Sequence, residues 1–123
     1  MKTKQTAPHI LVVDDELSMR EFLEIMLNRK GYRVSLAKNG KQALSLLGKN
    51  IFDLIICDIK LGDISGLEVL KKAKKENPAA IVIMISAYAS TETAVEAMNA
   101  GAYDYVPKPF DTDEFEQTIE NAL

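Results

Sequence analysis

Acidic, hydroxyl and cationic side chains follow four short apolar runs of the chain, at or just beyond the point where each run ends. They are Asp14 with Asp15, Asp58, Ser86 and Lys108. If these runs are parallel strands, the side chains meet at one edge of a sheet. Carboxylates about 4 Å apart repel by roughly 4 kcal/mol at an effective dielectric of 20, so three acids gathered there need positive charge. Mg²⁺, a hard cation that prefers oxygen ligands, and the ammonium of Lys108 would supply it.

A metal ion and a lysine that face one carboxylate make a site for phosphoryl transfer. The cations stabilise charge on the transferring oxygens while the carboxylate attacks phosphorus in line. Asp58 is the best-placed nucleophile because it directly follows a buried run, whereas the adjacent acids Asp14 and Asp15 lie where a metal would be held. Ser86 could donate a hydrogen bond to a new phosphoryl oxygen and move toward it, which is the behaviour of a switch contact.

The apolar pattern predicts alternating strands and helices that would position these side chains. Continuous apolar runs are typical of parallel strands buried on both faces, and amphipathic segments between them are typical of helices. The predicted strands span residues 10–13, 32–37, 54–57, 81–85 and 103–106. The predicted helices include residues 19–27, 41–47, 66–76, 91–100 and those that follow Asp111. This alternation favours an α/β fold with an open parallel sheet between two layers of helices.

Helical spacing also predicts which side chains face the sheet. In the first helix these are Met19, Phe22, Leu23, Met26 and Leu27. In the fourth helix they are Ala94, Val95 and Met98. The pair Asp111 and Glu114 resembles a capping box that begins the last helix.

Composition favours one small domain and excludes several classes of protein. The chain has 123 residues, 47% hydrophobic and 27% charged, which is enough for one core. A net charge of −3 argues against nucleic acid as a direct partner. The single cysteine, Cys57, excludes an internal disulfide framework, and no run resembles a membrane span or secretory signal, so we expect a cytoplasmic location without membrane contact. Residues 1–8 lack periodicity and are expected to form a flexible leader before a domain over 9–123.

Four stretches, LVVDDE, LIICDIKLGDISGLEVL, IVIMISAY and GAYDYVPKPF, resemble the receiver domain of bacterial two-component response regulators. The similarity extends from about His9 onward. It implies a flavodoxin-like (βα)5 doubly wound fold whose five parallel strands have the order 2-1-3-4-5. It also implies a signalling domain rather than an enzyme, which accepts a phosphoryl group from a sensor histidine kinase onto Asp58 with Mg²⁺ as cofactor. Because His9 is the only histidine, the donor histidine must belong to another protein.

The resemblance assigns the metal ligands. It implies that Asp15 and Asp58 bind Mg²⁺ through their side chains, that Lys60 binds it through its backbone carbonyl, and that Asp14 orients a metal-bound water. Receivers often have a proline where this chain has Gly62, so we expect a less rigid loop and a less preorganised metal-binding carbonyl.

The resemblance also assigns the response to phosphorylation. It implies that Lys108, before a cis peptide bond to Pro109, contacts the phosphoryl group. Ser86 and Tyr105 resemble a coupled switch pair in which the ring turns inward as the hydroxyl moves toward the phosphate. We expect the face formed by residues 91–123 to change and to control an output domain, a downstream protein or self-association.

A longer segment, SAYASTETAVEAMNAGAYDYVPKPF, is similar to the receivers of sigma-54-dependent transcription activators. This similarity implies a role in transcription regulation. Such activators continue into an ATPase domain and a DNA-binding domain, so a fragment of a longer regulator and a stand-alone receiver are both open.

The sequence disfavours three rival functions. An aspartyl-nucleophile phosphatase needs a second acid two residues after the nucleophile, where this chain has Lys60. A flavin- or nucleotide-binding module needs a Gly-rich or Ser/Thr-rich loop after the first strand, where this chain has acids. A receiver that is not phosphorylated and acts only as a protein-interaction module is disfavoured by the intact acids, Ser86 and Lys108, but the sequence leaves it open.

Overall fold

The computed structural model describes residues 7–123, so residues 1–6 of the predicted leader lie outside the described part. The last two leader residues, Ala7 and Pro8, already contact the sheet. Their carbonyl oxygens accept hydrogen bonds from Arg33, at 3.0 Å from Nε to Ala7 and 2.9 Å from the backbone nitrogen to Pro8.

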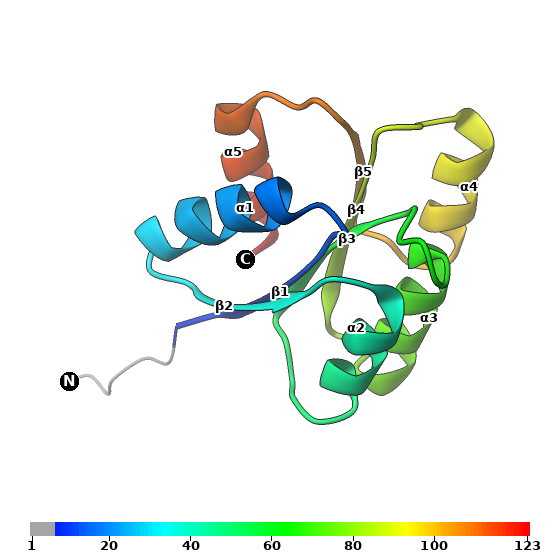
Figure 1. The fold of residues 1–123 in the computed structure, drawn as a ribbon, viewed down its shortest axis with the longest axis horizontal. Coiled ribbons are helices and arrows are strands. Elements are labelled where there is room, and N and C mark those ends of the chain that lie inside the picture. The colour runs from blue at the N-terminus through cyan, green and yellow to red at the C-terminus, as the bar shows by residue number, and fades with distance from the viewer. Residues whose placement is uncertain (1–6) are drawn as a thin grey trace.

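Within residues 7–123, five parallel strands alternate with five helices (Figure 1). The strands are β1 (His9–Val13), β2 (Arg33–Ala37), β3 (Leu54–Asp58), β4 (Ile81–Ser86) and β5 (Asp104–Pro107). The helices are α1 (Leu17–Arg29), α2 (Gly40–Leu47), α3 (Gly66–Glu76), α4 (Thr91–Asn99) and α5 (Thr112–Ala122). The strand order is β2-β1-β3-β4-β5, which confirms the predicted doubly wound α/β fold and its topology.

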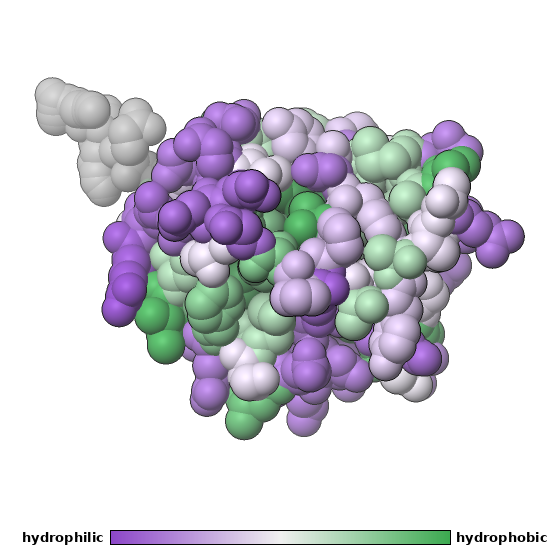
Figure 2. All heavy atoms as spheres, turned by 90° about the horizontal axis from the view of Figure 1, so that it is seen from above, coloured by the Kyte–Doolittle hydropathy of each residue, from purple (hydrophilic) through white to green (hydrophobic). Residues whose placement is uncertain are grey.

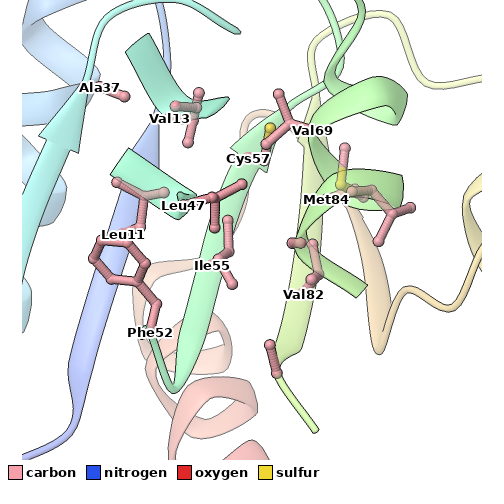
Figure 3. Close-up of a cluster of buried hydrophobic side chains, with 14 of the residues drawn as sticks. Leu11, Val13, Ala37, Leu47, Phe52, Ile55, Cys57, Val69, Val82 and Met84 are labelled. Atoms are coloured by element: carbon pink, nitrogen blue, oxygen red, sulfur yellow. The ribbon is translucent and has the colours of Figure 1, made fainter. Parts of the chain in front are cut away.

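The sheet has an apolar layer on each face because successive side chains of a strand point to opposite sides. Figure 3 shows the layer that faces α2 and α3, to which the sheet contributes Leu11, Val13, Ala37, Ile55, Cys57, Val82 and Met84. The other layer packs on α1 and α5 and includes Ile10, Val12, Leu54, Ile56, Phe115 and Ile119. Every residue of the central strand β3 is buried, so this strand presents its last residue, Asp58, from a rigid support.

The fourth helix does not pack as its sequence predicts. Of the residues of α4, only Ala97 is buried, while Val95 is 52% exposed and Met98 is 48% exposed. The prediction that Ala94, Val95 and Met98 face the sheet is therefore wrong for the two larger side chains. The helix packs through small side chains, Ala97 and the adjoining Ala100, which lie against the core layer beneath α3. Small residues allow a close approach, so the larger apolar groups are left on the outer face.

The other tested helices agree more closely with their patterns. In α1, Leu23, Met26 and Leu27 are buried as predicted, but Phe22 lies at the edge of the buried face and is 40% exposed. The last helix begins where the capping pattern indicates, because the Asp111 side chain accepts a hydrogen bond from the Glu114 backbone nitrogen at 3.0 Å.

The surface is mixed in character. On the side seen in Figure 2, hydrophobic groups are scattered among hydrophilic ones and do not form one continuous patch. In the described part of the chain, helices that combine the length and the hydropathy needed to cross a membrane are absent.

Candidate functional site

The three predicted acids meet at the carboxyl end of the sheet. Asp14 and Asp15 follow β1, and Asp58 ends β3, the strand paired with β1. One carboxylate oxygen of each acid lies within 4.8 Å of the other two. Asp14 is fully buried and Asp58 nearly so, whereas Asp15 is exposed. The fold thus brings together the acids that the sequence places apart.

The ammonium group of Lys108 lies between two of these acids. Its Nζ donates hydrogen bonds to Asp14 Oδ2 at 2.9 Å and to Asp58 Oδ2 at 2.8 Å, and it lies 3.6 Å from Glu16 Oε1. Burial lowers the pKa of Lys108, but the bonds to Asp58 and Asp14 outweigh that effect and raise it. The lysine is therefore held in its charged form against the cluster.

The acids carry more charge than the lysine neutralises. Burial raises the pKa of Asp58, although the hydrogen bond from Lys108 acts in the opposite direction. Asp58 Oδ1 accepts a hydrogen bond from the backbone nitrogen of Lys60 at 3.2 Å. Counted by formal charge, three carboxylates beside one ammonium leave an excess of two negative charges. A divalent cation matches both that charge and the all-oxygen donor set, so the residues present fit Mg²⁺.

The predicted switch residues occupy neighbouring strands. Ser86 ends β4, is buried, and its Oγ accepts a hydrogen bond from the backbone nitrogen of Tyr88 at 3.0 Å. Tyr105 lies on β5 beside Met84 of β4. Its side chain packs against the core layer shown in Figure 3, and its buried hydroxyl has no hydrogen-bond partner within residues 7–123. A buried hydroxyl without a partner costs about 1–3 kcal/mol, so this position of the ring is not fully stabilised.

A polar pocket opens beside Asp58. Residues that line it include Asp15, Asp58, Lys60, Gly62, Tyr88 and Lys108. Of these lining residues, Lys60 and Tyr88 contact each other: the ammonium of Lys60 lies 4.9 Å from the centre of the Tyr88 ring, within reach of a cation–π contact. The peptide bond between Lys108 and Pro109 is cis, as the resemblance implies. The acids are thus reachable from solvent by a small polar group.

Sequence reasoning missed three side chains around the site. Glu16 approaches Lys108, and Arg20 Nη1 donates to the Asp14 carbonyl oxygen at 2.8 Å. Asp63 accepts hydrogen bonds from the backbone nitrogens of Gly40 and Lys41, both at 2.9 Å. Glu16 adjoins the acid pair, so the sequence could have pointed to it, whereas Arg20 lies six residues from Asp14, which is not a helical contact spacing. No local signal marks Asp63, because its partners lie 23 and 22 residues away along the chain.

Comparison with known proteins identifies the family. The profile described as the response regulator receiver domain matches residues 10–120. The chain belongs to this family. The transcriptional regulatory protein ZraR of Klebsiella oxytoca is 46% identical over 114 residues, which cover 93% of this chain and 26% of that protein. The regulatory protein AtoC of Escherichia coli (strain K12) is 40% identical over 93% of this receiver and 25% of its own length. The receiver therefore spans about a quarter of these relatives.

Solved receiver structures support the same assignment. The receiver domain protein of Methanospirillum hungatei JF-1 has a TM-score of 0.89 at 36% identity, covering 95% of this chain and 94% of that one. The beryllofluoride-activated NtrC4 receiver domain dimer has a TM-score of 0.87 at 34% identity, covering 93% and 94%. The matches to ZraR and AtoC confirm the finer resemblance of this receiver to those of sigma-54-dependent transcription activators.

Proposed function

We propose that this receiver accepts a phosphoryl group on Asp58 from a sensor histidine kinase and acts as a phosphorylation-controlled switch. The observation that carries the proposal is the Lys108 ammonium, held 2.8 Å from Asp58 and 2.9 Å from Asp14 at the end of two buried strands. A cation in contact with a carboxylate at the rim of a polar pocket is the arrangement needed to receive an anionic phosphoryl group.

Mg²⁺ is the proposed cofactor. Asp15 and Asp58 would bind it through carboxylate oxygens, Lys60 through its backbone carbonyl, and Asp14 through an oriented water. The ion would offset the excess negative charge of the cluster and stabilise charge on the phosphoryl oxygens.

The proposed reaction is an in-line displacement at phosphorus. A carboxylate oxygen of Asp58 forms the new bond to phosphorus while the bond from phosphorus to the imidazole nitrogen of the kinase breaks, and the bonding electron pair goes to that nitrogen. Lys108 stays protonated and stabilises the negative charge of the transferring oxygens. The receiver acts only on its own acceptor, which makes it a signalling domain and not an enzyme.

The proposed output is a change in the face formed by residues 91–123. Phosphorylation would draw Ser86 toward the phosphoryl group and stabilise the inward position of Tyr105. The exposed Val95 and Met98 make the outer face of α4 suited to contact with an output domain, a downstream protein or a second copy. One solved relative is a receiver domain dimer, which supports self-association. The names of the relatives support transcription regulation as the output, and we place the protein in the cytoplasm with no direct contact to nucleic acid or membrane.

Intact mass after incubation with acetyl phosphate, with and without Mg²⁺, tests the acceptor. We expect one phosphoryl adduct that needs both Mg²⁺ and Asp58. Asp58→Asn should abolish it, whereas Asp53→Asn, which changes the acid that precedes the same strand, should leave it intact. An adduct that survives Asp58→Asn would refute the assignment of the acceptor. If the wild type forms no adduct and does not respond to beryllofluoride, the interaction-only function becomes the better one.

Amide hydrogen exchange tests the switch separately. Beryllofluoride with Mg²⁺ should change exchange in α4, β5 and α5 and should have little effect on β2. Unchanged exchange across residues 91–123 in a protein that carries the adduct would show that the output face lies elsewhere.

A further inference from the structure

The loop between β3 and α3, residues 59–65, carries the carbonyl group proposed to bind the metal and includes a glycine, Gly62. Gly62 has φ +89°, in the left-handed region that favours glycine, so this residue adds little rigidity of its own. Before it, the loop is held by the Lys60 amide on Asp58 Oδ1 and by the buried side chain of Leu61. The part of the loop after Gly62 needs a separate support.

Asp63 provides that support by joining the loop to another element. Its two carboxylate oxygens accept hydrogen bonds from the backbone nitrogens of Gly40 and Lys41, at 2.9 Å each, in the first turn of α2. A carboxylate suits this position because the first amides of a helix have no partner within the helix and carry partial positive charge. The bonds from Lys41 and Gly40 hold the pKa of Asp63 at about 2, so the group stays charged at neutral pH.

The contact also has a steric part. The neighbouring Ile64 lies directly over Gly40, where a Cβ atom would collide with its side chain. On the far limb of the loop, Ser65 pairs with Lys60 in an isolated bridge. Asp63 and Ile64 thus connect α2 to the strand-like segment that includes the carbonyl group of Lys60.

We propose that Asp63 is a positioning residue that holds the loop against α2 and so orders the Lys60 carbonyl for Mg²⁺. The proposal rests on the proposed function for the identity of the metal ligand. Asp63 itself acts through the loop and does not touch the metal or the phosphoryl group.

Asn39 offers a matched control within the same helix start. Its side chain accepts a hydrogen bond from the Gln42 backbone nitrogen at 2.8 Å and so caps α2 from the preceding segment, with no link to the loop. Asp63→Ala and Asn39→Ala should each lower the melting temperature by about 3–5 °C, because each removes one cap of α2. Only Asp63→Ala should affect the loop.

Two measurements on the full chain test the proposal. Without metal, NMR hydrogen exchange should show the Gly66 amide, which closes the loop through a 2.7 Å bond to the Ile59 carbonyl oxygen, exchanging about tenfold faster in Asp63→Ala only. With MgCl₂, isothermal titration calorimetry should show about tenfold weaker binding in Asp63→Ala, an intermediate loss in Asp63→Asn, and no change in Asn39→Ala.

Each result has a definite consequence. Unchanged Gly66 exchange in Asp63→Ala would overturn the proposal whatever the metal does. Faster exchange with unchanged Mg²⁺ affinity would also overturn it, since the variant would then lose order in the loop without any effect on metal binding. A wild-type protein that takes up the phosphoryl group and binds Mg²⁺ keeps the proposed function intact in either case. If the wild-type protein neither takes up the phosphoryl group nor binds Mg²⁺, the proposed function is refuted, and the proposed role of Asp63 in metal binding is refuted with it.

Discussion

The two sides of the acid cluster are built differently. On the anchored side, formed by α2, α3 and the 59–65 loop, Asp63 ties the loop to α2 and Gly66 lies in close contact with the backbone of Asp58. On the lightly packed side, formed by α4 and β5, the helix buries only Ala97, and the hydroxyl of Tyr105 lies buried without a partner in the described residues.

This difference suggests a division of labour. A metal site gains affinity when its ligands are already ordered, which requires the anchored side to resist movement. A switch requires an element with two arrangements of similar free energy, and weak packing with an unsatisfied polar group provides that. Lys108 and Ser86 join the two sides. Ser86 ends β4 and accepts a hydrogen bond from the Lys108 backbone nitrogen, and the Lys108 side chain, directly after β5, bonds to Asp14 and Asp58. Substitutions on the anchored side should therefore cost more stability than substitutions on the lightly packed side.

Glycine 66 should be the least replaceable position of the anchored side. A Cβ atom there would collide with the carbonyl group of Asp58 and the Cα atom of Ile59, which are backbone atoms and cannot rotate away. We expect Gly66→Ala to lower the free energy of unfolding by about 3 kcal/mol in urea denaturation. Gly48→Ala is the control, because its new Cβ would meet only ordinary contacts, the nearest at 3.6 Å, and should be neutral or slightly stabilising. Equal stability of the two variants would show that the anchored side yields easily.

Lysine 108 should be nearly as important for stability, through charge. Lys108→Met leaves Asp14 and Asp58 without a cation in a buried site, and we expect a loss of about 3 kcal/mol in the absence of metal. Addition of Mg²⁺ should raise the free energy of unfolding of Lys108→Met by more than it raises that of the wild type. The exposed Lys30, which pairs with Glu120 at 2.8 Å, is the control, and Lys30→Met should have little effect with or without Mg²⁺. If Mg²⁺ stabilises Lys108→Met no more than the wild type, Lys108 and the metal do not compensate the same acidic charge.

Removal of the Tyr105 hydroxyl should raise stability, in contrast to the two substitutions above, which lower it. Tyr105→Phe removes a buried hydroxyl that has no hydrogen-bond partner among residues 7–123, so we expect the free energy of unfolding to rise by about 1 kcal/mol. Tyr103→Phe, two residues earlier and 46% exposed, should change nothing measurable. A stability loss in Tyr105→Phe would mean that the hydroxyl is satisfied in solution, and the lightly packed side would then be better stabilised than its contacts indicate.

The strand ends could be predicted from the sequence because apolar runs of four or five residues that alternate with amphipathic helices favour parallel strands buried on both faces. Once β1, β3 and β4 are parallel neighbours, Asp14, Asp58 and Ser86 must share an edge. The outer face of α4 could not be predicted, because Val95 and Met98 fit an apolar stripe as well as Ala97 does and only the tertiary contacts choose between them. Asp63 was missed for a similar reason: its bonds to α2 depend on how two distant loops meet.

The smallest expected effect is the pH dependence of the Asp63 anchor. Its pKa falls from the ordinary 3.8 to about 2, mainly through the hydrogen bond from the Lys41 backbone nitrogen. Because the folded state binds the proton more weakly than the unfolded state, the stabilisation is present above pH 3.8 and is lost as pH falls toward 2. The urea midpoints of wild type and Asp63→Asn should therefore differ by a constant amount near neutral pH, begin to converge below about pH 4 and continue to converge down to about pH 2. A difference that stays constant through that range would mean that the carboxylate charge is not what holds the loop to α2, and that the anchored side depends on the contact of Ile64 with Gly40 instead.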